Sequence, residues 1–165
     1  MKIAIRLLLL AALGGLAFWL WTILFPNPER VVLKKISQLA ATATVNAGDG
    51  NITRATKVSS LIGYFSTDAQ IIVNISGAGA GSLSGRDEIR EAAAGGFTRL
   101  TSLNVRFLDA TARIGADKQS AEVKCTAQVR TGDSKDFAVQ EMCFQFRKID
   151  GDWLITRMET VKTLL

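Results

Sequence analysis

The chain has 165 residues, enough for one domain, and a formal net charge of +5. It contains no histidine, which excludes histidine-based metal sites, Ser-His-Asp triads and Cys-His dyads. Its basic residues are scattered rather than clustered, so nothing indicates a nucleic-acid-binding surface. We expect neither a metal nor a cofactor.

The most apolar segment lies at the N-terminus. Residues 7–25 carry no charge, and as a helix they would span about 28 Å, close to the hydrocarbon thickness of a bilayer. Lys2 and Arg6 precede this segment and favour a cytoplasmic N-terminus. Residues 7–25 are therefore predicted to contact the membrane as a single-pass helix.

Cleavage of this segment as a secretory signal peptide is the alternative. Gly15 and Ala17 form a weak small-x-small site, but cleavage there would leave a strongly apolar mature N-terminus. We favour an uncleaved signal-anchor over residues 1–28 in the inner membrane. Residues 29–165 would then form one periplasmic, or otherwise extracytoplasmic, domain.

Three amphipathic helices and one strand are predicted after the prolines at 26 and 28. Apolar residues at helical spacing are Val32, Ile36, Leu39 and Ala43 in the first helix, Ala55, Val58, Ile62 and Phe65 in the second, and Ile89, Ala93, Phe97 and Leu100 in the third, over 86–99. The sequence STDAQIIVNIS (66–76), between the second and third helices, is rich in β-branched residues and predicts a strand.

The glycine-rich sequence GAGAGSLSG (77–85) raises the question of a phosphate-binding loop. No lysine follows the glycines as a P-loop requires, and Ser84 occupies the place of the last glycine in a dinucleotide fingerprint. Ser84 and Asp87 fit a helix capping box instead. We therefore predict a hairpin-like connection followed by a capped helix.

The chain from residue 101 onward has the pattern of successive strands. Leu103, Val105 and Phe107 alternate, and the phase then shifts to Leu108, Ala110, Ala112 and Ile114, as a one-residue bulge would cause. Turn sequences at 115–118, 131–136 and 150–151 separate three further strands. The predicted fold is α+β, with three helices on one face of a curved antiparallel sheet.

Two segments resemble the nuclear transport factor 2-like (NTF2-like) superfamily, close to its SnoaL-like and ketosteroid-isomerase-like branches. The first, residues 64–92, carries the resemblance at Tyr64, Asp68, Ala69, Ser84, Gly85 and Ile89, and the second is DGDWLITRMETV, residues 150–161. The resemblance implies a cone, in which a curved sheet wraps a pocket closed by helices. It also implies frequent dimerisation through the sheet.

Enzymes of this superfamily place an aspartate on the first strand, or an Asp–His or Tyr–Asp set within the cone. In this chain Val73 and Asn74 stand where that acid would be. An asparagine side chain cannot remove a proton near neutral pH. This departure argues against isomerase or cyclase chemistry.

The candidate pocket follows from the register of the last two strands. A two-residue turn at Asp150-Gly151 predicts the pairs Phe146–Ile155, Phe144–Arg157 and Met142–Glu159, with all six side chains on one face. On a concave face Arg157 and Glu159 would form an ion pair inside the cone, whereas near an open end the pair would be hydrated. The candidate pocket residues are Tyr64, Asn74, Cys125, Phe144, Arg157 and Glu159.

The two cysteines, Cys125 and Cys143, fall nearly opposite each other on neighbouring strands. An oxidising compartment would permit a disulfide. Side-chain alternation nevertheless places Cys143 out of phase with Phe144, and cysteines on opposite faces of a sheet cannot bond. A second bulge would restore the bond.

Three functions are compatible with these features. The first is a membrane-anchored, non-catalytic binding or assembly module that contacts a protein partner. The second is a lyase or isomerase, in which Arg157 stabilises negative charge and Glu159 or Asp109 acts as base. The third is a carrier for a small apolar ligand held in the cone.

Overall fold

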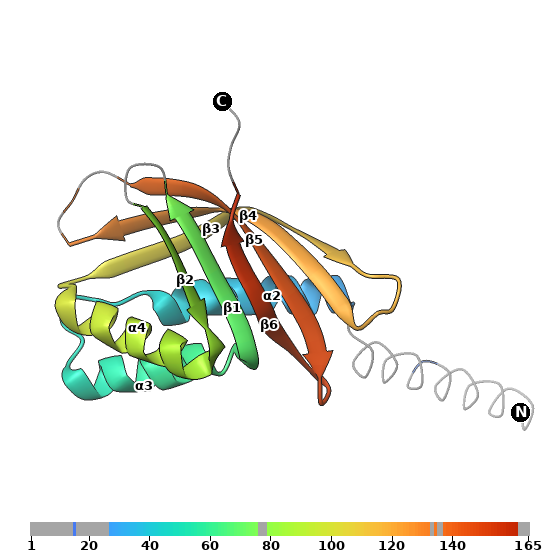
Figure 1. The fold of residues 1–165 in the computed structure, drawn as a ribbon, viewed down its shortest axis with the longest axis horizontal. Coiled ribbons are helices and arrows are strands. Elements are labelled where there is room, and N and C mark those ends of the chain that lie inside the picture. Colours follow the sequence, from blue (N-terminus) through green and yellow to red (C-terminus); the bar gives the residue numbers. More distant parts are fainter. Residues whose placement is uncertain (1–14, 16–26, 76–78, 133, 135–136, 162–165) are drawn as a thin grey trace, which may run out of the picture.

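The computed structural model describes residues 15, 27–75, 79–132, 134 and 137–161. The helices are α2 (Pro28–Ala43), α3 (Asn51–Ile62) and α4 (Gly85–Arg99), and the strands are β1 (Phe65–Ile75), β2 (Gly79–Ser84), β3 (Leu103–Ile114), β4 (Ser120–Thr131), β5 (Ala138–Ile149) and β6 (Asp152–Thr160). The strands form one curved sheet, α2 and α4 pack on one of its faces, and α3 packs on these two helices on the same side (Figure 1). We call this the helix-covered face and the other the open face.

The sheet has six strands in the order β2-β1-β6-β5-β4-β3. All neighbours are antiparallel except β1 and β6, which run parallel, with Ile71 beside Met158. The α+β architecture is therefore confirmed. The expectation of a purely antiparallel sheet was wrong, because β1 is inserted between β2 and the C-terminal strand.

The glycine-rich sequence forms an element that the prediction treated as a connection. Residues 79–84 pair antiparallel with β1 over six consecutive positions, from Ile75–Gly79 to Gln70–Ser84. Backbone hydrogen bonds to β1 hold this strand in place, even though its side chains are too small to give a β-strand pattern. Residues 76–78 lie outside the described part of the chain.

The cap of α4 differs from the predicted one. The Ser84 side chain makes no capping hydrogen bond. The Ser84 backbone N–H instead donates to the carboxylate of Glu88 (2.7 Å), and Asp87 pairs with Arg90. The predicted Ser84–Asp87 capping box was therefore wrong. Asp87 and Glu88 nevertheless lie in the first turn of the helix, where their negative charges suit the helix dipole.

The predicted helical faces are buried against the sheet. Val32, Ile36 and Leu39 of α2 lie in one core with Val58 and Ile62 of α3, joined by Ile89 and Phe97 of α4 and by Phe144 and Phe146 of β5. Phe65 is the exception to the helical prediction. It is buried, but it begins β1 instead of extending α3.

The predicted bulge in β3 is confirmed. The β3–β4 register shifts between Leu108 and Thr111, and Asp109 adopts a positive φ of 52°. Val105 and Phe107 before the bulge, and Ala110 after it, pack against the core. Leu108 was predicted to face inward after the shift, but its side chain is 38% exposed. The inward-facing alternation resumes at Ala110.

A second irregularity changes the register of β5 and β6. The turn at Asp150-Gly151 and the Phe146–Ile155 pair are as predicted, but Thr156 then has no partner and the register shifts. Phe144 therefore pairs with Met158, and Gln145 with Arg157. Cys143 pairs with Glu159, and Met142 with Thr160. The predicted pairs Phe144–Arg157 and Met142–Glu159 were wrong because of this extra residue.

The predicted membrane anchor falls almost entirely outside the described residues. Of residues 7–25, the structure describes residue 15 alone. Within the described part of the chain, none of the helices has the length and apolar character needed to cross a bilayer. The anchor stays a prediction.

The Arg54 side chain joins α3 to the end of α4. Its guanidinium donates to the carbonyls of Phe97, Leu100 (2.8 Å) and Thr101 (3.2 Å), and its Nε donates to the carbonyl of Asp49 (2.9 Å). The last carbonyls of a helix have no partner within the helix and carry its negative dipole end. Arg54 therefore satisfies these carbonyls and holds the two helices together.

We expect Arg54→Ala to lower the free energy of unfolding by about 2–3 kcal/mol, because hydrogen bonds to a charged donor are lost at partly buried carbonyls. Urea unfolding followed by circular dichroism measures this change. The control is Arg99→Ala in the last turn of α4, because the Arg99 side chain makes no hydrogen bond to the described residues and its expected loss is below about 1 kcal/mol. Equal losses in both variants would contradict this role of Arg54.

Candidate functional site

The candidate site is a cavity of about 330 Å³ between the helices and the helix-covered face of the sheet. Its lining residues come from all three helices and from all six strands: Leu39, Ala43, Leu61, Phe65, Ile71, Leu83, Ile89, Ala92, Ala93, Val105, Phe107, Ala127, Val129, Met142 and Met158. Every one of these side chains is apolar. The cavity is at the lower end of the range for small-molecule sites, about 300–1,000 Å³.

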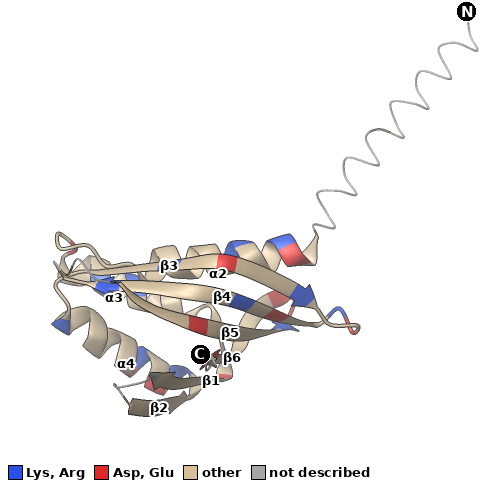
Figure 2. Ribbon diagram, turned by 90° about the horizontal axis from the view of Figure 1, so that it is seen from above, with Lys and Arg blue, Asp and Glu red and all other residues tan. Residues whose placement is uncertain are grey.

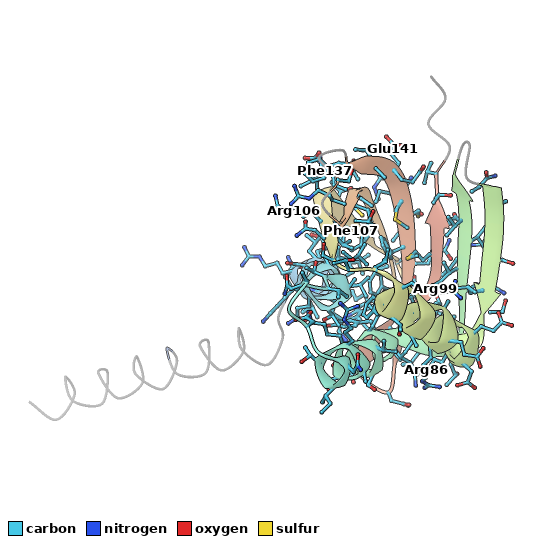
Figure 3. All side chains as sticks on the ribbon, turned by 90° about the vertical axis from the view of Figure 1, so that its left-hand side faces the viewer. Arg86, Arg99, Arg106, Phe107, Phe137 and Glu141 are labelled. Carbon is cyan, nitrogen blue, oxygen red and sulfur yellow. The ribbon has the colours of Figure 1, made fainter. Side chains whose placement is uncertain are left out.

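The cavity stays unfilled because several of the side chains that face it are small. Ala43 of α2, Ala92 and Ala93 of α4 and Ala127 of β4 face it where larger side chains would close it. Beneath it, Phe107 packs edge-on against Phe144, with ring centroids 5.3 Å apart. Figure 3 shows Phe107 between the sheet and the helices, whereas Phe137 and Glu141 lie at the outside of the sheet.

The lining determines the chemistry that the cavity permits. Among the described residues that line it, there is no ionisable side chain and no side-chain hydrogen-bond donor or acceptor other than the weakly accepting methionine sulfurs. A polar ligand group buried here would lose its hydrogen bonds to water without replacement. The cavity therefore selects apolar ligands and offers no side chain for general acid–base catalysis.

Arg157 and Glu159 lie on the open face, on the other side of the sheet from the cavity. The shifted register pairs them with Gln145 and Cys143 instead of the predicted Phe144 and Met142. Arg157 Nε donates to Glu159 Oε2 (2.8 Å), and Gln70 Oε1 lies 3.4 Å from the guanidinium. The two side chains are 37% and 32% exposed, so they form the hydrated ion pair that the sequence left as an alternative.

Tyr64 and Asn74 also lie outside the cavity lining. The Tyr64 hydroxyl is 3.5 Å from Thr42 Oγ1, and its carbonyl accepts from the Ile155 N–H (2.8 Å). Asn74 is exposed at the end of β1, where its backbone N–H donates to Thr160 Oγ1 (2.8 Å). Asp109, the alternative catalytic base, is exposed at the β3 bulge.

Cys125 and Phe144 belong to the core, and neither lines the cavity. Cys125 pairs with Met142 and Cys143 pairs with Lys124, which places the two cysteines on opposite faces. Both are free thiols in the structure. This agrees with the argument from alternation.

Both thiols are protected from ionisation. Burial raises the pKa of the Cys125 thiol to about 12. Burial, followed by the negative charges of Glu122 and Glu159, also raises the pKa of the Cys143 thiol. Because the thiolate is the reactive form, neither cysteine is suited to act as a nucleophile near neutral pH.

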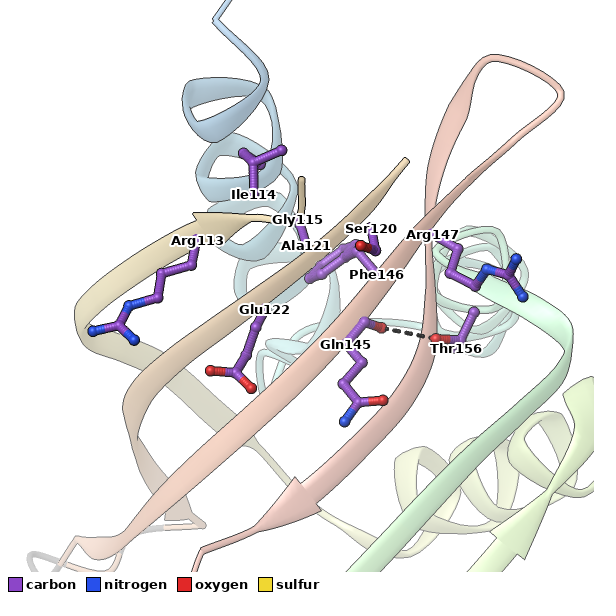
Figure 4. A pocket seen from close by; sticks show the side chains of 10 residues that line it. All are labelled: Arg113, Ile114, Gly115, Ser120, Ala121, Glu122, Gln145, Phe146, Arg147 and Thr156. Atoms are coloured by element: carbon purple, nitrogen blue, oxygen red, sulfur yellow. Dashed lines mark hydrogen bonds between the residues drawn. The ribbon is translucent and has the colours of Figure 1, made fainter. Parts of the chain in front are cut away.

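A shallow depression of about 430 Å³ lies on the open face and differs in character from the cavity. Figure 4 shows Arg113, Glu122, Gln145 and Thr156 around it, with Thr156 Oγ1 donating to the Gln145 carbonyl (3.2 Å). Its lining mixes charged, polar and apolar side chains, whereas the lining of the cavity is apolar throughout. We therefore regard the apolar cavity as the better candidate site.

The family resemblance implied the cone, but no sequence pattern marked the residues that border its cavity. Ala93 was placed on the buried stripe of its helix, yet nothing in the sequence distinguishes a buried alanine that packs from one that borders a space. Met158 was missed because the prediction paired β5 and β6 without the Thr156 irregularity. No local sequence signal marks that extra residue.

The chain matches no known protein-family model, and it matches no curated protein. Solved structures resemble it. An NTF2-like protein with a cystatin-like fold from Novosphingobium aromaticivorans is 20% identical, with 90% of this chain and 88% of that chain covered and a TM-score of 0.60. A protein of unknown function with a cystatin-like fold from Nostoc punctiforme is 14% identical, over 82% and 91% of the two chains, with a TM-score of 0.59.

A third structure comes from a protein of Novosphingobium aromaticivorans that is proposed to be a scytalone dehydratase. It is 14% identical, over 82% of this chain and 83% of that chain, with a TM-score of 0.58. At these identities the similarity establishes the fold alone. The domain therefore has the NTF2-like, cystatin-like fold that the sequence resemblance implied.

We expect the folded protein to resist alkylation of both cysteines by iodoacetamide at pH 8. A pKa of about 12 in place of 9.0 for Cys125 reduces its thiolate population about 1,000-fold. Raising the pH should restore reactivity only as it approaches the raised pKa. Intact mass spectrometry measures the labelled fraction in native buffer and in 8 M urea, where both cysteines should react.

Intact mass with and without reductant checks the cysteines independently. Free thiols predict the same mass in both samples. A mass that increases on reduction would show a Cys125–Cys143 disulfide, and would contradict the opposite-face arrangement.

Proposed function

We propose that this domain is a non-catalytic binding module that holds a small apolar ligand in the helix–sheet cavity. The supporting observation is the lining itself, which is apolar on every element that contributes to it. A cavity of about 150 Å³ with such a lining stays dry and binds benzene. The larger cavity here has room for a ligand of two fused rings or for a short branched hydrocarbon.

We also propose that residues 7–25 tether the domain to the inner membrane, with the domain on the extracytoplasmic side. The uncharged stretch of bilayer-spanning length in the sequence supports this proposal. A tethered apolar pocket would exchange ligands with the bilayer, where apolar molecules concentrate. A protein partner is compatible with the same arrangement.

A lyase is the second candidate, favoured by the similarity to the proposed scytalone dehydratase. The side chains expected to perform that chemistry, Arg157 and Glu159, pair with each other on the open face. Catalysis in the cavity would need an acid or base that the described lining residues do not supply. These observations support binding over catalysis.

Ala93→Leu should fill the cavity and weaken ligand binding about tenfold or more, a loss of at least about 1.4 kcal/mol. Binding of the apolar fluorophore N-phenyl-1-naphthylamine measures the affinity. Thermal unfolding should show a more stable variant, because filling a cavity commonly contributes about 0.5–2 kcal/mol. Native mass spectrometry of the purified wild type should detect co-purified ligand that is absent from the variant.

Two controls accompany this experiment. Ala94→Leu alters the neighbouring alanine of α4, which is exposed in a groove toward α3, and should leave fluorophore affinity unchanged. Arg157→Ala should also bind normally, because Arg157 lies on the open face. If Ala93→Leu binds as tightly as wild type, the cavity is not the binding site.

Full-length protein should remain with the membrane pellet after a wash with alkaline carbonate, because a spanning helix is held by about 20 apolar residues. A variant that begins at Asn27 should be released into the soluble fraction. N-terminal sequencing of the membrane-bound protein checks that the leader is retained. A mature N-terminus beyond Phe25 would contradict the tether.

A further inference from the structure

The sheet has two free edges, and they differ in how they are protected. An exposed edge offers unpaired N–H and C=O groups to another strand, and proteins usually block it with charges, proline, bulges or covering segments. In the described part of the chain, β3 forms one edge and β2 the other.

The β3 edge is blocked in several ways. The Leu103 and Val45 backbones exchange two hydrogen bonds (2.7 and 2.8 Å), and the Val105 N–H donates to Thr44 Oγ1 (3.2 Å). Farther along, the bulge at Asp109 interrupts the strand. The strand also carries Arg106 and Arg113, both exposed.

The β2 edge has almost none of these protections. Its sequence, GAGSLS, contains no charge and no proline, and its register with β1 is continuous. Five of its six residues are exposed. Figure 2 shows this strand free of charged residues, while β3, β4 and β5 carry them. Among the described residues, Glu88 alone contacts its backbone with a carboxylate, at Ser84.

We propose that β2 pairs antiparallel with β2 of a second copy of this chain, joining the two sheets edge to edge. Strand addition obtains affinity from backbone hydrogen bonds and specificity from side-chain pockets. The glycines, alanine and serines of β2 provide no such pockets for a foreign peptide. They do allow an identical strand to approach closely, with no charge repulsion about a twofold axis.

The fold resemblance implied dimerisation through the sheet, and this proposal places the contact at the β2 edge of the sheet. Ser82 pairs with Ile72 of β1 and lies near the centre of β2, on the open-face side. A twofold axis through the centre of β2 brings the two Ser82 side chains within about 8 Å of each other on one face of the joined sheet. Charges introduced at this position would therefore meet across the interface.

Sedimentation velocity of the full-length protein in a mild detergent tests the proposal. We expect wild type to form a dimer whose fraction increases with concentration, and Ser82→Glu to weaken dimerisation about tenfold or more by like-charge repulsion. Ser82→Lys should behave in the same way. An equimolar mixture of the Glu and Lys variants should restore the dimer as a heterodimer.

Thr111→Glu is the matched control, since Thr111 is exposed in β3 at the other edge of the sheet. It should dimerise as wild type does. A wild-type chain that stays monomeric at every concentration would overturn the proposal. A Ser82→Glu variant that dimerises as tightly as wild type would also overturn the proposal, whatever the Thr111→Glu variant does. Circular dichroism of each variant checks that β2 substitutions leave the domain folded.

Discussion

One unpaired residue in β6, Thr156, determines which side chains of the last two strands face the helices. Successive residues of a strand point to opposite faces, so a single extra residue exchanges the two faces beyond it. Met158 is thereby brought into the cavity, and Arg157 and Glu159 are placed on the open face. Without the shift, an ion pair would enter an apolar space, where its desolvation would be costly.

The apolar cavity depends on this separation of charge from hydrocarbon. The helix-covered face carries the core and the cavity lining, whereas ion pairs such as Lys124–Glu122 and Arg157–Glu159 lie on the open face. An apolar cavity that the core leaves unfilled is costly, because its lining atoms lose packing contacts. The alanines that border the cavity are consistent with a bound ligand that restores those packing contacts.

The two edges of the sheet also differ from each other, because β3 is covered and interrupted whereas β2 is accessible. The segment after α2 covers the start of β3 through Thr44 and Val45, and the bulge interrupts its middle. The β2 strand is instead formed by residues that rarely build strands, and it exists through its backbone pairing with β1. Its small side chains leave the backbone accessible at the outer edge.

The sequence alone determined the three helices, the β3 bulge, the Asp150-Gly151 turn and the NTF2-like arrangement. The helices and the bulge follow from local periodicity, which reports the face that a residue must bury, and the turn follows from its Asp-Gly pair. The NTF2-like arrangement was implied by the resemblance of two short segments to that superfamily. The tertiary structure alone decided that residues 79–84 form a strand, that β1 lies parallel to β6, and that Ala93 and Met158 border a cavity. These features arise from pairing between segments distant in the chain, and no local pattern encodes the partner.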